Sequence, residues 1–404
     1  MAVPVRPGCT FVDARPDCAT LWTGTQKPHY ARDGVASLLG LPPEKVQGIW
    51  VIGPGSFGRN DAGDAALLSK LTGKLVRVQG MRRDGTAWDP KAPASVHRAR
   101  AALDASGKVI AYEFISRAFS RADIDSNESD PRDSLVGMEL GMPPRAGIGF
   151  GTPAESYGFE SKLLGWEVVP ALLDRASPLC TSHMRDPVGL QIHFASEQFI
   201  DELAVAPGED AVAFRLKYLT APRDQAVAKA AHKANRLARP SPPPERSADV
   251  LKGRGIAYAQ RGGTILAVVA KIEVDRKTGR IRGRKFTVAH DYGLIVNPEG
   301  LRFTIEGGLV QALSRSLFEE VSFDQNMVTS VDWSSYPILE MRDAPESINV
   351  VLINRPEAAP TGAGEATCRV EPAAVVNAFF DAAGVRLRRA PMTPSRVKAA
   401  LASA

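Results

Sequence analysis

The chain has 404 residues, of which 44% are hydrophobic and 24% charged, as in an ordinary globular protein with room for two or three domains. Its net charge of +5 arises from 50 basic residues interleaved with 45 acidic ones, so we do not expect nucleic-acid binding. The four cysteines are too scattered for this chain alone to build a zinc site or an iron–sulfur cluster. No apolar run is long enough to span a membrane.

The first half of the chain alternates strand and helix patterns. A strand is expected before the loop "TGTQKP", followed by a short helix, a Pro-Pro break and a strand over 46–52. A glycine-rich loop then leads into a helix, a strand over 75–81, and a hairpin that turns at Asp104–Lys108. Residues 121–160 are polar and rich in glycine and proline, so we expect a long ordered loop there.

The second half contains the clearest helical patterns. "HFASEQFIDELAVAPGEDAVAFRLKYL" predicts helix broken at Pro207-Gly208, and a basic helix follows it. Next come an antiparallel hairpin that turns at Lys277-Thr278-Gly279, a long helix from "RFTIEGG", and a final helix "EPAAVVNAFFDAAG" closed by Gly384.

These elements predict an α+β fold with two lobes, built of mixed sheets and packed helices. The Pro/Ser-rich stretch near 221–255 is the best internal boundary. We therefore expect a first cofactor-binding domain over 1–220, a linker over 221–255 and a second cofactor-binding domain over 256–404.

Two glycine loops carry the chemical signal. "GPGSFG" at 53–58 matches the G-x-G-x-x-G of dinucleotide-binding proteins, but no repeated βαβ pattern surrounds it and no acidic residue ends the next strand. "GAGE" at 362–365 places a carboxylate on a permissive backbone before a helix. This glutamate is either a solvated turn residue or a positioned general base, and the motif alone does not choose between them.

Five stretches together resemble the molybdenum-binding subunit of the xanthine oxidase/aldehyde oxidase family, of the isoquinoline 1-oxidoreductase and nicotinate dehydrogenase type. They are "WTGTQKP", "GPGSFGRNDAGDAALLS", "FASEQFIDELAVAPGEDAVAFRLKYL", "VNPEGLRFTIEGGLVQAL" and "GAGEATCRVEPAAVVNAFFDA". The resemblance extends over nearly the whole chain and implies the second half of a split large subunit.

The resemblance implies roles for particular residues. Glu365 is implied as the general base, and Phe57 as the aromatic residue beside the molybdenum. Gln26 is implied to hydrogen-bond an oxo ligand, and Arg185 to lie in a loop that borders the pterin. Asp61 is a candidate substrate-facing acid, although an acid favoured by a helix N-terminus explains it equally well. The remaining implied cofactor-binding residues belong to the two glycine loops: Gly55, Ser56, Gly58, Gly362, Ala363 and Gly364.

The implied cofactor is molybdenum held by molybdopterin, as the cytosine dinucleotide usual in bacterial relatives, with no metal ligand supplied by the protein. The implied activity is hydroxylation of an N-heteroaromatic ring carbon with oxygen derived from water, and Glu365 accepts the proton. Electrons must leave through a [2Fe-2S] partner, because this chain lacks the cysteines for a cluster, and then pass to a cytochrome or flavoprotein acceptor.

The sequence departs from the family pattern at several places. No "GQG" occurs, so we expect a second molybdopterin-binding chain to supply the missing front half of the site. Thr304 stands where many relatives have Gln, Val188 where Gly is common, and no Pro follows Glu365.

Three alternatives remain open at this point: an aldehyde dehydrogenase of the same family, a non-catalytic scaffold half, and an NAD(P)-binding module. The start of the chain lacks the pattern of a signal peptide, so a cytoplasmic location is expected, with periplasmic co-export beside a partner as the alternative.

Overall fold

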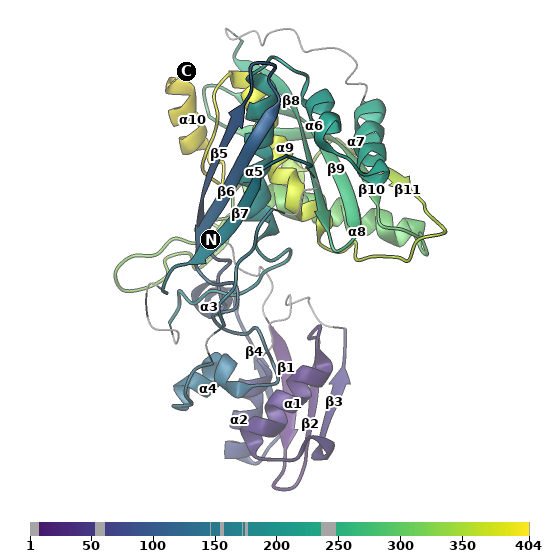
Figure 1. Cartoon of the computed structure of the whole chain (residues 1–404). Helices are drawn as coiled ribbons and strands as arrows, with labels where there is room; N and C mark the ends of the chain where they lie inside the picture. The colour runs from purple at the N-terminus through teal and green to yellow at the C-terminus, as the bar shows by residue number, and fades with distance from the viewer. Residues whose placement is uncertain are drawn as a thin grey trace.

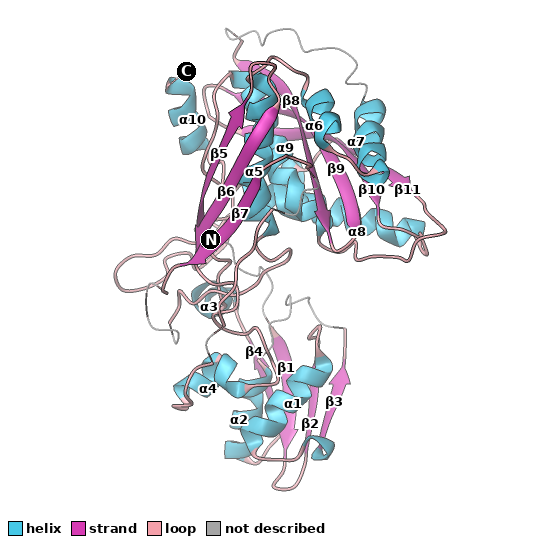
Figure 2. Cartoon of the chain, in the orientation of Figure 1, coloured by secondary structure: helices cyan, strands magenta, loops and turns pink. Residues whose placement is uncertain are grey.

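The computed structural model describes residues 8–52, 61–145, 147–153, 157–171, 173, 177–235 and 248–403. They form an α+β protein with a smaller lobe near the N-terminus and a larger lobe built from the rest of the chain (Figure 1). The predicted fold class is therefore confirmed. The short helix α3 (Arg82–Trp88) and several loops lie between the two lobes (Figure 2).

The smaller lobe is a four-stranded mixed sheet with helices packed against it. Its strand order is β3-β2-β1-β4, and β2 and β3 run parallel because helix α1 connects them. Buried apolar side chains between Val12 and Ala66 form its core. The elements are β1 (Cys9–Ala14), β2 (Ala19–Thr23), α1 (Pro28–Leu39), β3 (Val46–Trp50), α2 (Ala62–Thr72) and β4 (Val76–Gln79).

The larger lobe contains two further sheets. One has the order β5-β6-β7, in which β5 and β6 form the predicted hairpin; Asp104 donates its N–H to the carbonyl of Lys108 at the turn. The other has the order β11-β10-β9-β8. Their strands are β5 (Ser95–Leu103), β6 (Val109–Ala118), β7 (Lys162–Val168), β8 (Val250–Arg261), β9 (Thr264–Asp275), β10 (Ile281–Asp291) and β11 (Ser347–Ile353).

Six helices longer than one turn surround these two sheets in the described part of the larger lobe. Helices α5 and α6 are separated at the predicted Pro207-Gly208 break, where Gly208 has a φ of 74°. The helices are α5 (Gly189–Val205), α6 (Ala211–Tyr218), α7 (Pro222–Asn235), α8 (Pro298–Leu317), α9 (Ala366–Ala383) and α10 (Pro394–Ala402). A one-turn helix, α4 (Leu135–Glu139), and 3₁₀ turns at Pro43–Lys45, Pro131–Asp133 and Met341–Asp343 complete the described elements.

Helix α9 is the buried centre of the larger lobe, and glycines on β8 let it approach the sheet. A Cβ atom on Gly255 would lie 2.2 Å from the backbone nitrogen of Ala378, and one on Gly253 would lie 2.1 Å from the carbonyl oxygen of Ala378. Real Cβ atoms do not come so close to backbone, so any side chain here would push α9 away. Because α9 begins immediately after Glu365, this packing fixes the position of the Glu365 backbone, from which the carboxylate side chain extends.

We expect Gly255→Ala to destabilise the protein by about 1–3 kcal/mol or more, because the added methyl overpacks a backbone-to-backbone contact. The matched control is Gly307→Ala on α8, where a Cβ would meet no atom within 4 Å. That change is expected to be neutral or to stabilise by up to about 1 kcal/mol, since alanine favours helix over glycine. Urea unfolding of both variants checks the pair, and equal losses would contradict the packing argument.

Three differences from the expected elements have physical causes. Strand β8 lies partly within the expected linker, and its glycines weakened the strand pattern in the sequence. Strand β7 follows the expected long loop, and its exposed side chains do not alternate clearly in character. Helix α9 starts five residues before the expected helix and keeps Pro372 inside it, because burial along α9 offsets the missing hydrogen bond.

The cores do not follow the expected domain boundary at 221–255. Helix α7 lies inside that span and packs on β9 and β10. One hydrophobic cluster joins residues from Val109 to Ala231 with residues from Ile256 to Ala289. In the described residues, the smaller lobe has a separate core cluster whose last buried member is Ala66, before α3. The three-part domain division stays a prediction.

Candidate functional site

The glycine loop before α9 is held by the tip of the β8–β9 hairpin. Thr264 donates its hydroxyl to the carbonyl oxygen of Gly362 at 2.9 Å and lies 2.6 Å from the hydroxyl of Thr361. The hairpin turns through Gly262 and Gly263, whose φ values are 55° and 87°. This tight turn is possible because glycine adopts positive φ without strain.

Both carboxylate oxygens of Glu365 contact other residues of the chain. Its Oε1 accepts the backbone N–H of Asp186 at 3.1 Å, and its Oε2 forms an ion pair with Arg261, the last residue of β8. The Glu365 and Arg261 side chains are each about a third exposed. Glu365 is also the N-cap residue of α9, yet its side chain makes no capping hydrogen bond. The carboxylate therefore contacts Asp186 and Arg261 instead of the first backbone N–H groups of its own helix.

Asp186 is the buried anion at the centre of this arrangement. Its side chain is fully buried and accepts hydrogen bonds from Arg261 Nε at 3.1 Å and from Arg369 Nη2 at 2.7 Å. Asp186 and Val188 have φ values of 54° and 61°, in the left-handed region. Val188 thus keeps the backbone conformation that glycine favours, although its branched side chain is strained there and buried in the core.

Arg185 joins the same site from the other side of the glycine loop. Its Nε donates to the carbonyl oxygen of Gly364 at 2.7 Å, and its Nη1 donates to Gln311 on α8 at 3.1 Å. The carbonyl of Arg185 in turn accepts from Arg315 at 2.9 Å. Arg185 and the 362–365 loop, which lie about 180 residues apart in the sequence, are therefore in direct contact.

Two of the remaining predicted residues, Gln26 and Asp61, belong to the smaller lobe. Gln26 is exposed just beyond β2, and the neighbouring Thr25 donates its hydroxyl to Glu128 at 3.0 Å. Because β2 and β3 are parallel, their carboxyl ends meet at one edge of the sheet. Gln26 and residues 51–52 follow those carboxyl ends, and that edge faces the larger lobe (Figure 1). The predicted residues Gly55, Ser56, Phe57 and Gly58 lie outside the described residues.

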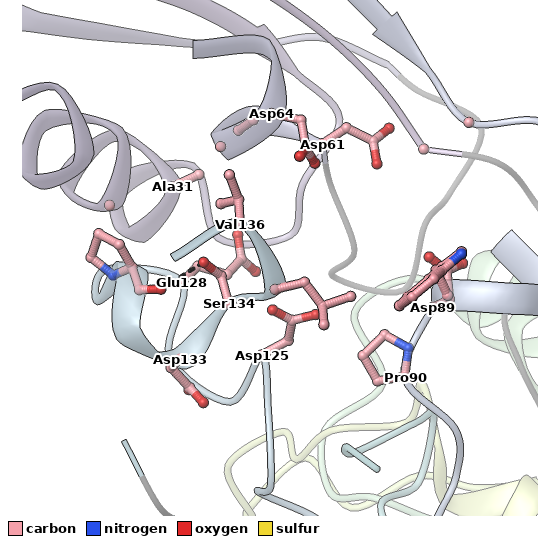
Figure 3. Close-up of a pocket in the computed structure, with 18 of the residues that line it drawn as sticks. Ala31, Asp61, Asp64, Asp89, Pro90, Asp125, Glu128, Asp133, Ser134 and Val136 are labelled. Carbon is pink, nitrogen blue, oxygen red and sulfur yellow. Dashed lines mark hydrogen bonds between the residues drawn. The ribbon is translucent and has the colours of Figure 1, made fainter. Parts of the chain in front are cut away.

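An acidic cavity of about 210 Å³ lies beside this edge. Figure 3 shows Asp61 and Asp64 on one side of the cavity, Asp125 across from them, and Asp89 on a third side. Asp133 also lines the cavity, and its carboxylate accepts the hydroxyl of Ser126 at 2.7 Å and the N–H of Asn127 at 2.6 Å. Two further acidic residues, Asp84 and Glu128, also line the cavity.

Burial raises the pKa of Asp61 to about 6, with a smaller contribution from the neighbouring charge of Asp64. A carboxyl whose folded-state pKa lies above its unfolded value stabilises the fold at low pH and loses that contribution as pH rises through the folded pKa. We therefore expect Asp61→Asn to match the parent at pH 4 and to be more stable at pH 8, by at most about 3 kcal/mol.

Urea unfolding of the Asp61→Asn variant at the two pH values tests this expectation. The control is Asp17→Asn, which changes an exposed aspartate of the same lobe. A stability gain from Asp61→Asn that is the same at both pH values would contradict the assigned cause.

The two regions differ in which ligands they suit. A Cβ on Gly362 or Gly364 would meet no atom within 4 Å, so open space lies beside the glycine loop. The uncapped N-terminus of α9 and the nearby Arg185 favour an anionic group there. The acidic cavity would repel phosphate. A molybdopterin, with its phosphate and oxo groups, therefore fits the glycine loop and not the cavity.

The described residues contain no cluster of three or more His, Cys, Asp or Glu arranged to hold a metal ion. In the same residues, no helix is long and apolar enough to cross a membrane.

Sequence reasoning missed Asp186, Arg261 and Thr264, which position the predicted loop. The "RGGT" of the hairpin tip was the available signal, because two glycines between strands predict a tight turn. Nothing in the sequence indicates that this tip contacts a loop about 100 residues later.

Two family models, each described as a molybdopterin cofactor-binding domain, match residues 3–120 and 203–345 and together include well over half of the chain. The chain belongs to this family of molybdopterin-binding domains of the xanthine oxidase type. The first match contains the G-x-G-x-x-G segment, and the second contains Arg261 and most of the sheet around α9.

Among curated proteins, the chain is similar to the B subunit of nicotinate dehydrogenase from Pseudomonas putida, with 35% identity over 98% of this chain and 34% of the relative. It is also similar to the beta subunit of isoquinoline 1-oxidoreductase from Brevundimonas diminuta, with 28% identity over 97% of this chain and 48% of the relative. The chain thus spans between about a third and a half of these relatives.

Solved structures confirm the fold. The aldehyde oxidoreductase of Desulfovibrio gigas matches with a TM-score of 0.78 at 16% identity, over 99% of this chain and 60% of that one. Quinoline 2-oxidoreductase of Pseudomonas putida 86 matches with a TM-score of 0.77 at 14% identity, over 99% of this chain and 75% of that one.

Proposed function

We propose that this chain is the catalytic molybdopterin-binding part of a molybdenum hydroxylase that acts on a ring carbon of an N-heteroaromatic compound, such as a pyridine or quinoline derivative. The observation that carries the proposal is the Glu365 carboxylate, held by Asp186 and Arg261 beside an open glycine loop. The names of the two curated relatives support the substrate class.

The chain's own residues supply binding, orientation and a proton acceptor. The loop Gly362-Ala363-Gly364 and Arg185 would hold the cofactor, together with Gln26 and the 55–58 segment. When bound, the molybdenum centre supplies the two-electron oxidation and the insertion of oxygen derived from water. Glu365 accepts the proton released from that water, and we assign it to Oε1, since Oε2 is paired with a guanidinium.

The proposal extends to the partners. A second molybdopterin-binding chain completes the site, a small [2Fe-2S] subunit takes the electrons, and a cytochrome or flavoprotein accepts them. Both curated relatives are named as one subunit of a larger enzyme, which agrees with an assembly of several chains. The pterin is proposed to carry the cytosine dinucleotide. The compartment is proposed to be the cytoplasm, with periplasmic co-export as the alternative, and cell fractionation distinguishes the two compartments.

Aldehyde oxidation to carboxylate is the second candidate, because the fold is shared with an aldehyde oxidoreductase. Assaying the intact complex with a pyridine and quinoline set against an aldehyde set separates the two. Turnover confined to the heterocycles supports the proposal, and turnover confined to aldehydes replaces it with the second candidate.

A further inference from the structure

The tip of the β8–β9 hairpin contributes one charged side chain to the glycine loop. Arg261 contacts two anions at once: its Nη2 pairs with Glu365 Oε2, and its Nε donates to Asp186 Oδ1 at 3.1 Å. Its position is fixed by the sheet, because β8 pairs with β9 up to the last pair, Arg261 with Thr264. Thr264 then binds the same loop at Gly362.

From these contacts we infer that Arg261 is the positioning residue for Glu365: it fixes the carboxylate beside the glycine loop by holding Oε2, while the Asp186 N–H holds Oε1. This inference rests on the proposed function, in which Glu365 accepts a proton. Arg261 itself touches neither substrate nor cofactor in this role, and acts through the carboxylate that it orients.

Two other arginines near Glu365 have different partners. Arg369 of α9 donates to Asp186 and to the carbonyl oxygen of Gln260, and Arg185 donates to the carbonyl oxygen of Gly364 and to Gln311. In the described part of the chain, Glu365 forms its ion pair with Arg261. The guanidinium of Arg261 is therefore the cation that acts on the carboxylate directly.

Asp186 makes this arrangement rigid. Its carboxylate is fully buried between Arg261 and Arg369, and its own backbone N–H holds Glu365 Oε1 at 3.1 Å. One buried residue thus fixes both the guanidinium and the opposite oxygen of the base. Shorter side chains than glutamate usually cap helices. Glu365 stands at the N-cap position of α9, but its carboxylate is held by the long-range contacts with Asp186 and Arg261 and not by a local capping hydrogen bond.

The charged groups facing Glu365 come from several elements: Arg261 from β8, Arg185 and Asp186 from the loop before α5, and Arg369 from α9; Arg315 of α8 holds the Arg185 carbonyl. Removing Arg261 leaves Glu365 Oε2 without its ion pair, so the carboxylate is held only at Oε1 by the Asp186 N–H.

The experiment compares Arg261→Gln and Arg261→Lys with the parent in the intact, cofactor-loaded complex. We expect Arg261→Gln to lower kcat at least tenfold with little change in KM, because the Glu365 carboxylate is then held at one oxygen instead of two. Arg261→Lys should recover part of kcat, because an ammonium reaches one of the two anions but not both. Molybdenum content and the urea unfolding midpoint are measured on the same samples.

The matched control is Arg284→Gln, which removes an arginine of similar exposure that also pairs with two anions, Glu346 and Glu273, near the other end of the same sheet. It should leave kcat, KM and molybdenum content unchanged. A parental kcat in Arg261→Gln would overturn the inference. Loss of molybdenum or of folding in both Arg261 variants would also overturn it, since Arg261 would then be structural.

Including Glu365→Gln separates this inference from the proposed function. If Glu365→Gln keeps its turnover, the proposed function fails, whatever the Arg261 variants do. If Glu365→Gln is inactive and Arg261→Gln behaves as the parent, the function stands and the positioning role of Arg261 falls.

Discussion

Replacing Glu365 by Gln is expected to lower kcat about 10²–10⁴-fold, the usual loss when a general base is removed. Glutamine keeps the size of the side chain and can still accept the Asp186 N–H, so the loop should keep its structure. It cannot accept the proton, and its amide has no charge to pair with Arg261. The measurement is steady-state turnover of the intact complex with its heteroaromatic substrate, at matched molybdenum content.

The control for the substitution is Glu340→Gln, which changes an exposed carboxylate paired only with Arg342 among the described contacts. If Glu365→Gln retained parental turnover with full molybdenum occupancy, the chain would be a scaffold that closes a site without catalysing the reaction.

Replacing Arg215 by Met is expected to destabilise the protein by about 3–5 kcal/mol, because it leaves a buried carboxylate without its cation. Arg215 and Glu197 are both fully buried and joined at 2.9 Å. Glu197 also accepts the hydroxyl of Tyr157 at 2.8 Å and the N–H of Tyr258 at 2.9 Å. This network connects helices α5 and α6 to β8, the strand that ends at Arg261.

Denaturant unfolding measures this loss. The control is Lys217→Met, which changes a residue on the same helix as Arg215. It removes the exposed ion pair between Lys217 and Glu209 and should cost about 0–1 kcal/mol. Similar losses from the two variants would show that the buried network contributes no more than a surface pair.

The sequence predicted those parts of the fold whose signals are local. The β5–β6 and β9–β10 hairpins follow from strand-like segments on either side of glycine-containing turns, and the structure confirms both. The break between α5 and α6 follows from Pro207-Gly208 in the same way. Strand β8 escaped prediction because Gly253 and Gly255 serve the packing of α9, which no local pattern reveals.

In the candidate site too, the sequence predicted the residue with a local signal and missed the residues without one. Glu365 could be singled out because glycines and a helix surround it in the sequence, and resemblance to a family gave it a role. Its partners Asp186 and Arg261 are about 180 and 100 residues away, and the contact depends on the folded sheet. Ion pairs of this kind leave no periodicity, so sequence reasoning had no means to find them.

The most direct test of the account is the molybdenum and nucleotide content of the intact complex that contains this chain. The account predicts stoichiometric molybdenum, and cytidine monophosphate released by acid in equal amount. A folded, intact complex without molybdenum would contradict it, and would make tight nicotinamide-nucleotide binding by the G-x-G-x-x-G segment the next hypothesis to measure.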